Sequence, residues 1–195
     1  VMISGYTLQN HALLIPDEID GKPVTAVMQD ETRYLSGDSI ETVKLPAALK
    51  VIGERAFYRF SALRELVIPS SLEEIGHGAF YNCARFDHLK LPPTLKRLGR
   101  EAFNYCRRLG AVTLPDGLEE IGARTFEGFG RLGTVTLPRT IKIIGERAFA
   151  KTNIAQINLP EGLEVIRKGA FMEHRIGSLV LPASLNHVSA EAFTS

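Results

Sequence analysis

Two dipeptides recur along this chain of 195 residues at one common spacing. Both series advance by 23, 23, 23, 23, 22 and 22 residues. Ala-Phe, replaced once by Thr-Phe, occurs at residues 56–57, 79–80, 102–103, 125–126, 148–149, 170–171 and 192–193. Leu-Pro, replaced once by Ile-Pro, occurs at residues 45–46, 68–69, 91–92, 114–115, 137–138, 159–160 and 181–182. The two independent markers have the same period, and both shorten from 23 to 22 residues at the same point. The chain is therefore an array of structural repeats.

Each repeat predicts a short strand followed by a turn. Aligned, the repeats read L-x-x-[LIV]-x-[LI]-P-x-x-[LI]-x-x-[ILV]-G-x-x-A-F-x-x-C/F. The segment before the proline, such as residues 63–68, ends in the apolar alternation of a half-buried strand. Pro69 and its equivalents lack an N–H group and end the strand. Gly76 and its equivalents predict a turn with positive φ, although Arg167 and Ser189 hold that position in the last two full repeats.

The recurring phenylalanine predicts how the repeats pack. A unit of 23 residues cannot cover its own apolar face, so the copies must stack and close one continuous core. Like side chains then lie above one another in columns. We expect the spine of the core to be the column of Phe57, Phe80, Phe103, Phe126, Phe149, Phe171 and Phe193.

The repeat also carries a resemblance to a known family. Leu-x-x-Leu-x-Leu is typical of leucine-rich repeats. The full unit, LP…L..IG..AF..C..L, resembles the BspA-like leucine-rich-repeat family, and Gly5-Tyr6-Thr7, Ile15-Pro16 and residues 19–25 resemble its usual lead-in. The resemblance covers essentially all of 1–195, except that residues 27–39 lack the expected motif and make the first repeat two residues longer. It implies a protein that is secreted or attached to the cell surface, commonly in bacteria and in some parasitic protists, and several such proteins are adhesins.

These observations predict a mostly β repeat protein. We expect a right-handed leucine-rich-repeat solenoid with a parallel sheet on its concave side and short turns or 3₁₀ segments on its convex side. Residues 1–195 would form one domain. Its parts would be an N-terminal cap at 1–24, repeats of 22–25 residues at 25–182, and a truncated last repeat at 183–195.

Charge and hydropathy exclude two classes of partner. Basic residues number 23 and acidic residues 22, which leaves none of the basic excess of a nucleic-acid-binding protein. No apolar run approaches the ~20 residues that cross a bilayer, so we expect no membrane insertion. The opening VMISGYTLQN lacks the features of a signal peptide, but a mature or trimmed chain would look the same. The extracellular or cell-surface location that the resemblance implies is compatible with this.

No arrangement of residues indicates catalysis, and we expect no enzyme, cofactor or metal site. The five histidines fall at five different places in the repeat, whereas zinc needs three or four converging ligands. Asp87 and His88 are neighbours on a predicted strand and should point to opposite faces. Glutamate pairs such as Glu73-Glu74 recur at one place, which is typical of a solvated face.

The two cysteines, Cys83 and Cys106, occupy one column of the repeat. Phe60 and Phe129 hold the same position in the flanking repeats, which indicates a small apolar core residue. Adjacent rungs about 5 Å apart would also allow a disulfide, although parallel side chains in a column seldom reach its required dihedral angle.

The remaining candidate for function is the exposed side of the predicted sheet. Charge there is confined to the first three strands, and later strands carry small, neutral or hydroxyl-bearing residues. Seven rungs would give a surface about 30 Å long. The predicted binding residues are Thr42, Lys44, Glu65, Val67, His88, Lys90, Thr113, Thr134, Thr136, Gln156 and Asn158.

We expect this surface to make the chain a non-catalytic recognition or adhesion module. Its partner would be a protein, such as a host or neighbouring-cell surface protein. A plain solvated β surface, with the chain acting as a passive spacer in a larger surface protein, is one alternative. Carbohydrate binding is another, but it predicts aromatic platforms, and Tyr58, Tyr81 and Tyr105 lie beyond the Phe column rather than on the sheet.

Overall fold

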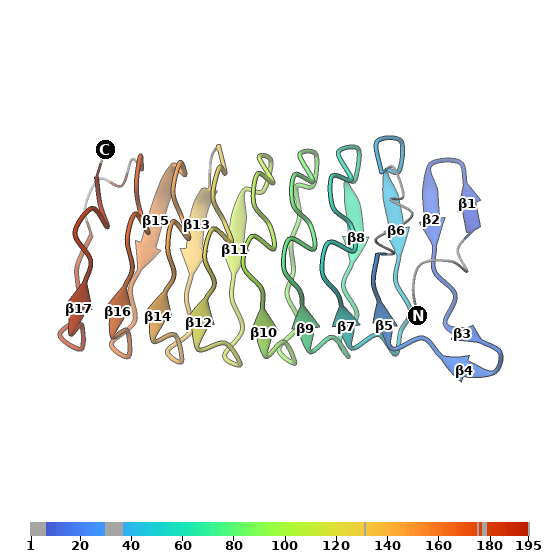
Figure 1. Cartoon of the computed structure of the whole chain (residues 1–195), viewed down its shortest axis with the longest axis horizontal. Coiled ribbons are helices and arrows are strands. Elements are labelled where there is room, and N and C mark those ends of the chain that lie inside the picture. Colours follow the sequence, from blue (N-terminus) through green and yellow to red (C-terminus); the bar gives the residue numbers. More distant parts are fainter. Residues whose placement is uncertain (1–6, 30–36, 131, 175, 177–178, 195) are drawn as a thin grey trace.

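The chain forms a row of similar coils that follow one another along a single axis (Figure 1). The structure, a computed structural model, describes residues 7–29, 37–130, 132–174, 176 and 179–194. These residues form strands and turns, without any helix or 3₁₀ segment. The predicted parallel β-solenoid and its turns are therefore confirmed, and the 3₁₀ option does not occur in the described part.

One ladder of strands is formed by the segments that precede the Leu-Pro dipeptides. An antiparallel hairpin starts it, and parallel pairing from coil to coil continues it. We call the exposed side of this ladder the strand face. Its strands are β1 (Thr7–Gln9), β2 (Ala12–Leu14), β6 (Thr42–Lys44), β8 (Glu65–Val67), β11 (Ala111–Thr113), β13 (Leu132–Thr136) and β15 (Ile154–Asn158).

A second parallel ladder lies in the half of each coil that follows the proline. We call it the outer ladder. Its strands are only two residues long, too short for an alternating pattern to reveal, and sequence analysis expected only turns or 3₁₀ segments here. They are β5 (Ala26–Val27), β7 (Val51–Ile52), β9 (Glu74–Ile75), β10 (Arg97–Leu98), β12 (Glu120–Ile121), β14 (Ile143–Ile144), β16 (Val165–Ile166) and β17 (His187–Val188). The hairpin of β3 (Glu18–Ile19) and β4 (Lys22–Pro23) projects at the N-terminal end (Figure 1).

The predicted phenylalanine spine is confirmed. From Phe57 to Phe193 each ring stacks on that of the next coil, with centroids 5.3 to 5.9 Å apart and planes within 15° of parallel. Six of the seven rings are fully buried, and Phe193, in the last coil, is half-buried. Stacked rings of this kind stabilise a core beyond the area that they bury, so each coil is tied to both of its neighbours.

The glycine that ends each outer strand is explained by close packing. Its predicted positive φ is wrong, because the glycines with positive φ are others. A Cβ on Gly99 would lie 2.6 Å from the Gly76 carbonyl carbon, and one on Gly76 would lie 2.7 Å from that of Gly53. The column is therefore small because the backbones of successive coils approach closely there. Positive φ falls two residues later, for example at Arg55 (52°) and Glu101 (57°).

Hydroxyl groups that sequence analysis missed hold several of the turns that follow the prolines. The Leu72 N–H donates to the Pro69 carbonyl, and Ser71 Oγ donates to the carbonyls of Ala47 (2.8 Å) and Leu49 (2.7 Å) in the preceding coil. Thr94 makes the equivalent pair of bonds one coil later. Serine, threonine or glycine before the second apolar residue was the signal that could have identified these contacts between coils.

Candidate binding surface

The strand face brings most of the predicted binding residues into two straight columns. The register places Thr42 beside Glu65 and Lys44 beside Val67. Farther along, it places Thr134 beside Gln156, and Thr113, Thr136 and Asn158 in one row. These side chains are exposed, apart from Thr42, which is half-buried. His88 and Lys90 are exposed as well but do not lie on a strand.

The strand-face ladder is interrupted at the fourth coil. One sheet ends at β8 and the next begins at β11, and the coil between them carries no arrow in the upper row of Figure 1. Residues 87–91 form no backbone hydrogen bond with the described part of the chain. The expected continuous surface of seven rungs is therefore wrong here. The interruption coincides with Phe86, a buried ring where neighbouring coils have Leu63 and Leu109.

A groove opens at this interruption. Its volume is about 1030 Å³, and it crosses the strand face from Arg108 to Pro93. Val67, 83% exposed, lies on it, together with His88 and Lys90. Three of the predicted binding residues thus meet at one concave site. We call it the central groove.

A smaller hollow lies near the C-terminal end of the strand face. It has a volume of about 500 Å³ and is lined by Gln156 and Asn158 of β15 and by Val180. Val180 is 84% exposed and occupies the same column as Val67. The two most exposed aliphatic side chains among the described residues therefore both line hollows on this face.

Charged residues differ between the two ladders. On the outer ladder Glu73 pairs with Lys96 (2.9 Å) and Lys50 (3.6 Å), and Glu74 pairs with Arg97. The hydrogen bond from Lys96, aided by the charges of both lysines, holds the pKa of Glu73 below its usual value. Glu73 and Glu74, whose pattern indicated a solvated face, are thus partly exposed and paired with cations.

Charges on the strand face lack such partners. Lys44, Glu65 and Lys90 make no ion pair within the described part of the chain. The contact there is between His88 Nε2 and Asp87 Oδ1 at 3.6 Å. The expectation that these two side chains point apart is wrong, because neither residue lies on a strand. His88 is 94% exposed, so this is a surface pair in water rather than a catalytic arrangement.

Two of the histidines make hydrogen bonds to backbone carbonyls. His11 Nδ1 lies 2.8 Å from the Ser39 carbonyl, and His77 Nδ1 lies 3.0 Å from that of Arg100. Among the described residues no three of His, Cys, Asp and Glu converge on a point that could hold a metal ion. These histidines are local hydrogen-bonding residues.

The two cysteines are free and fully buried. Cys83 and Cys106 each donate a weak hydrogen bond to a carbonyl of the preceding coil, that of Phe57 at 3.3 Å and that of Phe80 at 3.1 Å. Burial is the main cause that raises the pKa of the Cys83 thiol well above its usual value. Thr152, in the same column, makes the equivalent bond to the Phe126 carbonyl. The column is therefore a core position that also donates to the backbone.

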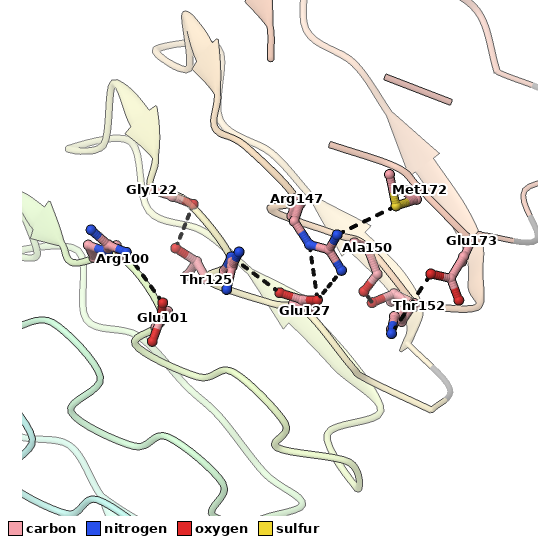
Figure 2. Close-up of polar contacts among 12 residues, drawn as sticks. Arg100, Glu101, Gly122, Thr125, Glu127, Arg147, Ala150, Thr152, Met172 and Glu173 are labelled. Carbon is pink, nitrogen blue, oxygen red and sulfur yellow. Dashed lines mark hydrogen bonds and ion pairs between the residues drawn. The ribbon is translucent and has the colours of Figure 1, made fainter. Parts of the chain in front are cut away.

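A buried carboxylate links three coils away from the strand face, as Figure 2 shows. The Glu127 side chain is 5% exposed, and its Oε1 accepts a hydrogen bond from Arg147 Nη2 at 2.6 Å. Arg124 approaches the other oxygen at 3.8 Å, and Arg147 also reaches Met172 Sδ at 3.6 Å. The bond to Glu127 raises the pKa of Arg147. Because the carboxylate is saturated by two guanidinium groups, the cluster is a structural clamp between coils.

The repeats match a known family over most of the chain. A model described as the BspA type leucine rich repeat region matches residues 31–128 and 73–195. The chain belongs to this family. A comparison with curated proteins found no match. BspA-type repeats thus account for the coils that carry both ladders and the central groove.

Three solved bacterial structures share the fold. A leucine-rich repeat protein from Bacteroides ovatus is 24% identical, with a TM-score of 0.77 over 94% of this chain and 53% of that chain. A leucine rich cell surface protein from Faecalibacterium prausnitzii is 26% identical, with a TM-score of 0.76 over 97% and 50%. A T. pallidum leucine rich repeat protein is 24% identical, with a TM-score of 0.61 over 73% and 76%. This chain therefore spans about half the length of the first two.

The described residues contain no helix with the length and apolarity that a bilayer crossing requires. Leucine-rich repeats of this type generally serve as protein-interaction modules without catalytic activity. On the strand face, charges without ion-pair partners, the two most exposed aliphatic side chains of the described residues and two hollows occur together.

Proposed function

We propose that this BspA-type solenoid is a non-catalytic recognition module that binds a protein partner through the strand face. Its setting is extracellular or at a cell surface, as for the similar protein of F. prausnitzii, which is called a cell surface protein. The partner is a host or neighbouring-cell surface protein, so the module serves adhesion. The family, whose repeats typically mediate protein interactions, supports the first part of this proposal.

One observation carries the proposal: on the strand face, charges without ion-pair partners lie next to a strongly exposed aliphatic side chain. Outer-ladder charges such as Glu73, Glu74 and Lys96 neutralise one another. Lys44, Glu65 and Lys90 remain without ion-pair partners among the described residues, next to an aliphatic side chain that is 83% exposed. Surface patches that combine exposed apolar area with a polar rim are typical of protein-binding sites.

The aromatic side chains argue against sugar binding at this face. Tyr58 and Tyr81 stack with ring centroids 4.9 Å apart, but they lie in the turns that follow the Phe column. The guanidinium groups of Arg55 and Arg59 lie 5.7 and 5.4 Å from the centre of the Tyr58 ring. The strand face itself has no tyrosine or phenylalanine at its predicted binding positions.

A matched pair of triple variants tests the proposal. The chain is immobilised and tested by interferometry against a panel of extracellular-matrix proteins and against a glycan array. The strand-face variant Glu65→Ala/His88→Ala/Lys90→Ala is expected to weaken binding to any matrix protein that binds the parent. The control, Glu119→Ala/Lys142→Ala/His187→Ala, removes the same three residue types from the outer ladder and is expected to leave affinity unchanged.

Other outcomes would decide against the proposal. If the strand-face variant binds the matrix protein as tightly as the parent and the control do, the binding site lies away from the strand face. Binding to glycans alone would favour a carbohydrate-binding module. A chain that binds neither matrix proteins nor glycans would behave as a passive spacer.

A further inference from the structure

We propose that the central groove binds an extended peptide segment of the partner, one that places an acidic side chain beside an aliphatic one. This inference rests on the proposed function and narrows it to one site and one ligand class. The site is the interruption between β8 and β11, where the coil of residues 87–91 lies. Three features of the groove point to this ligand.

The first feature is the apolar surface of the groove. Leu66, Val67, Leu89 and Pro93 all line it. A valine side chain that is 83% exposed gains from burial, since apolar surface removed from water contributes roughly 25 cal/mol per Å². An aliphatic side chain of the peptide would cover it. Val67 belongs to this surface but not to the protein core, so it is available for a ligand.

The second feature is backbone that is open to pairing. Residues 87–91 contain no proline and form no backbone hydrogen bond with the described residues, so five N–H and five C=O groups in a row are available. The strands on both sides, β8 and β11, are the terminal strands of their sheets. Extended peptides bind such open backbone through main-chain hydrogen bonds, which tolerate many sequences.

The third feature is positive charge on the rim. Lys90 and Arg108 line the groove, are exposed, and have no carboxylate partner in the described part of the chain. The groove's own carboxylate, Asp87, is in contact with His88. A peptide carboxylate would therefore find two unpaired cations, one of them an arginine, which can bind it through two parallel hydrogen bonds.

The dimensions of the groove favour a short peptide over a folded surface. Two rung spacings, about 10 Å, separate β8 from β11, and residues 87–91 lie between these strands. A globular surface would bridge the hollow without reaching Leu66 or Leu89, both of which are half-buried. An extended segment can place one side chain on Val67 and its carboxylate between Lys90 and Arg108. Charge complementarity thus selects the acidic, aliphatic peptide.

The test uses a phage-displayed library of linear nonapeptides, selected on the whole chain. We expect enrichment of sequences in which Asp or Glu lies next to or near Val, Ile or Leu. A fluorescein-labelled selected peptide is then titrated by fluorescence polarisation. Arg108→Ala and Val67→Thr are each expected to weaken its binding about tenfold or more. Arg108→Glu should bind better when the acidic residue of the peptide is replaced by lysine.

Matched controls lie outside the groove. Arg139→Ala removes an exposed arginine, and Val188→Thr changes an exposed valine of the outer ladder. Neither is expected to change the affinity. Thermal melting of all variants checks that they fold, and the high exposure of Val67 and Arg108 predicts melting like that of the parent.

Four results would overturn the inference. No enriched peptide, or enrichment without acidic residues, would exclude the ligand class. Peptide binding that falls with Thr134→Lys but not with Arg108→Ala would place the site elsewhere on the strand face and leave the proposed function standing. Peptide binding that neither Thr134→Lys nor Arg108→Ala weakens would contradict both this inference and the proposed function of the strand face. Self-association that Val67→Thr abolishes would make a second copy of the chain the occupant.

Discussion

Phenylalanine and glycine have complementary roles within each coil. The Phe column fills the interior with rings that stack between 5.3 and 5.9 Å apart. The glycine column leaves room for the backbones of successive coils, where a Cβ on Gly99 would lie 2.6 Å from a main-chain carbon. The same repeat therefore needs the largest side chains at one corner and the smallest at another. Both requirements act between neighbouring coils.

Loss of one spine ring should destabilise the chain strongly. Phe103 is fully buried between Phe80 and Phe126. We expect Phe103→Ala to lower the free energy of unfolding by about 3–5 kcal/mol, since a large cavity remains between two coils. Val180→Ala, at a side chain that is 84% exposed, serves as the control and should change little. Denaturant unfolding measures both, and an F103A chain as stable as the parent would contradict the stacked register.

The glycine column permits a matched comparison of two substitutions. Gly99→Ala should cost about 1–3 kcal/mol, because the added methyl would overlap the backbone of the preceding coil. Gly110→Ala meets no atom within 4 Å and should stay within about 0.5 kcal/mol of the parent. Thermal or denaturant melts of the two variants check this. Equal stability of both would mean that coil spacing at Gly99 is wider than described.

At the level of elements, both ladders are divided near the middle of the chain. The outer ladder runs as two sheets, β5-β7-β9-β10 and β12-β14-β16-β17, with ion pairs between adjacent coils at Glu73 and Glu74. The strand-face ladder is interrupted in the middle, next to Phe86. Where both ladders are interrupted, backbone hydrogen bonds between the turns at the Phe column, such as that from the Phe103 N–H to the Thr125 carbonyl, still join the neighbouring coils.

Amide hydrogen exchange should report the interruption directly. In the free chain, we expect the amides of residues 87–91 to exchange faster than those of 134–136, which lie in β13 between two partner strands. Mass spectrometry of peptic fragments measures both segments in one experiment. Slow exchange at 87–91 would mean that this coil pairs with its neighbours and that the groove is closed.

The outer-ladder ion pairs should make stability depend on pH. The lysines lower the pKa of Glu73 in the folded chain, so the ionised carboxylate stabilises the fold above its unfolded pKa. That contribution is lost as the pH falls through the lower, folded pKa. The difference in melting temperature between the parent and Glu73→Gln should therefore be present near pH 7 and shrink below about pH 4.

A control for this pH dependence lies two coils away. Glu119 precedes β12 as Glu73 precedes β9 but has no ion-pair partner among the described residues. Glu119→Gln is expected to show no such pH-dependent difference. A difference of equal size for both variants would assign the effect to net charge rather than to the pairs with Lys96 and Lys50.

For the whole molecule, the sequence predicted the stacking but not its details. The common period of Phe and Leu-Pro implies coils in register, and the spine follows from it. The outer ladder was not predictable from two-residue strands. The central groove was not predictable either, because Phe86, Leu89 and Leu91 satisfy the same apolar pattern as other coils. Only the bulk of Phe86 and the extra proline at residue 93 distinguish that coil.

Sequence analysis identified the exposed side of the sheet as the binding surface but did not locate the central groove. Columns of exposed residues follow from strand alternation, so Thr134, Thr136 and Gln156 lie as expected. Arg108 was missed because it lies in the turn before the strand, outside both columns. Its position on the lining of the central groove depends on the path of that turn, which an alternating pattern does not report.

We propose that partners bind the strand face of this solenoid and not its outer ladder. Hydrogen exchange of the chain bound to a matrix protein that it captures tests this most directly. We expect protection confined to the strand face, at residues 42–44, 65–67, 87–91, 111–113 and 134–136. Protection at 74–75, 97–98 and 120–121 of the outer ladder, with an unchanged strand face, would contradict it.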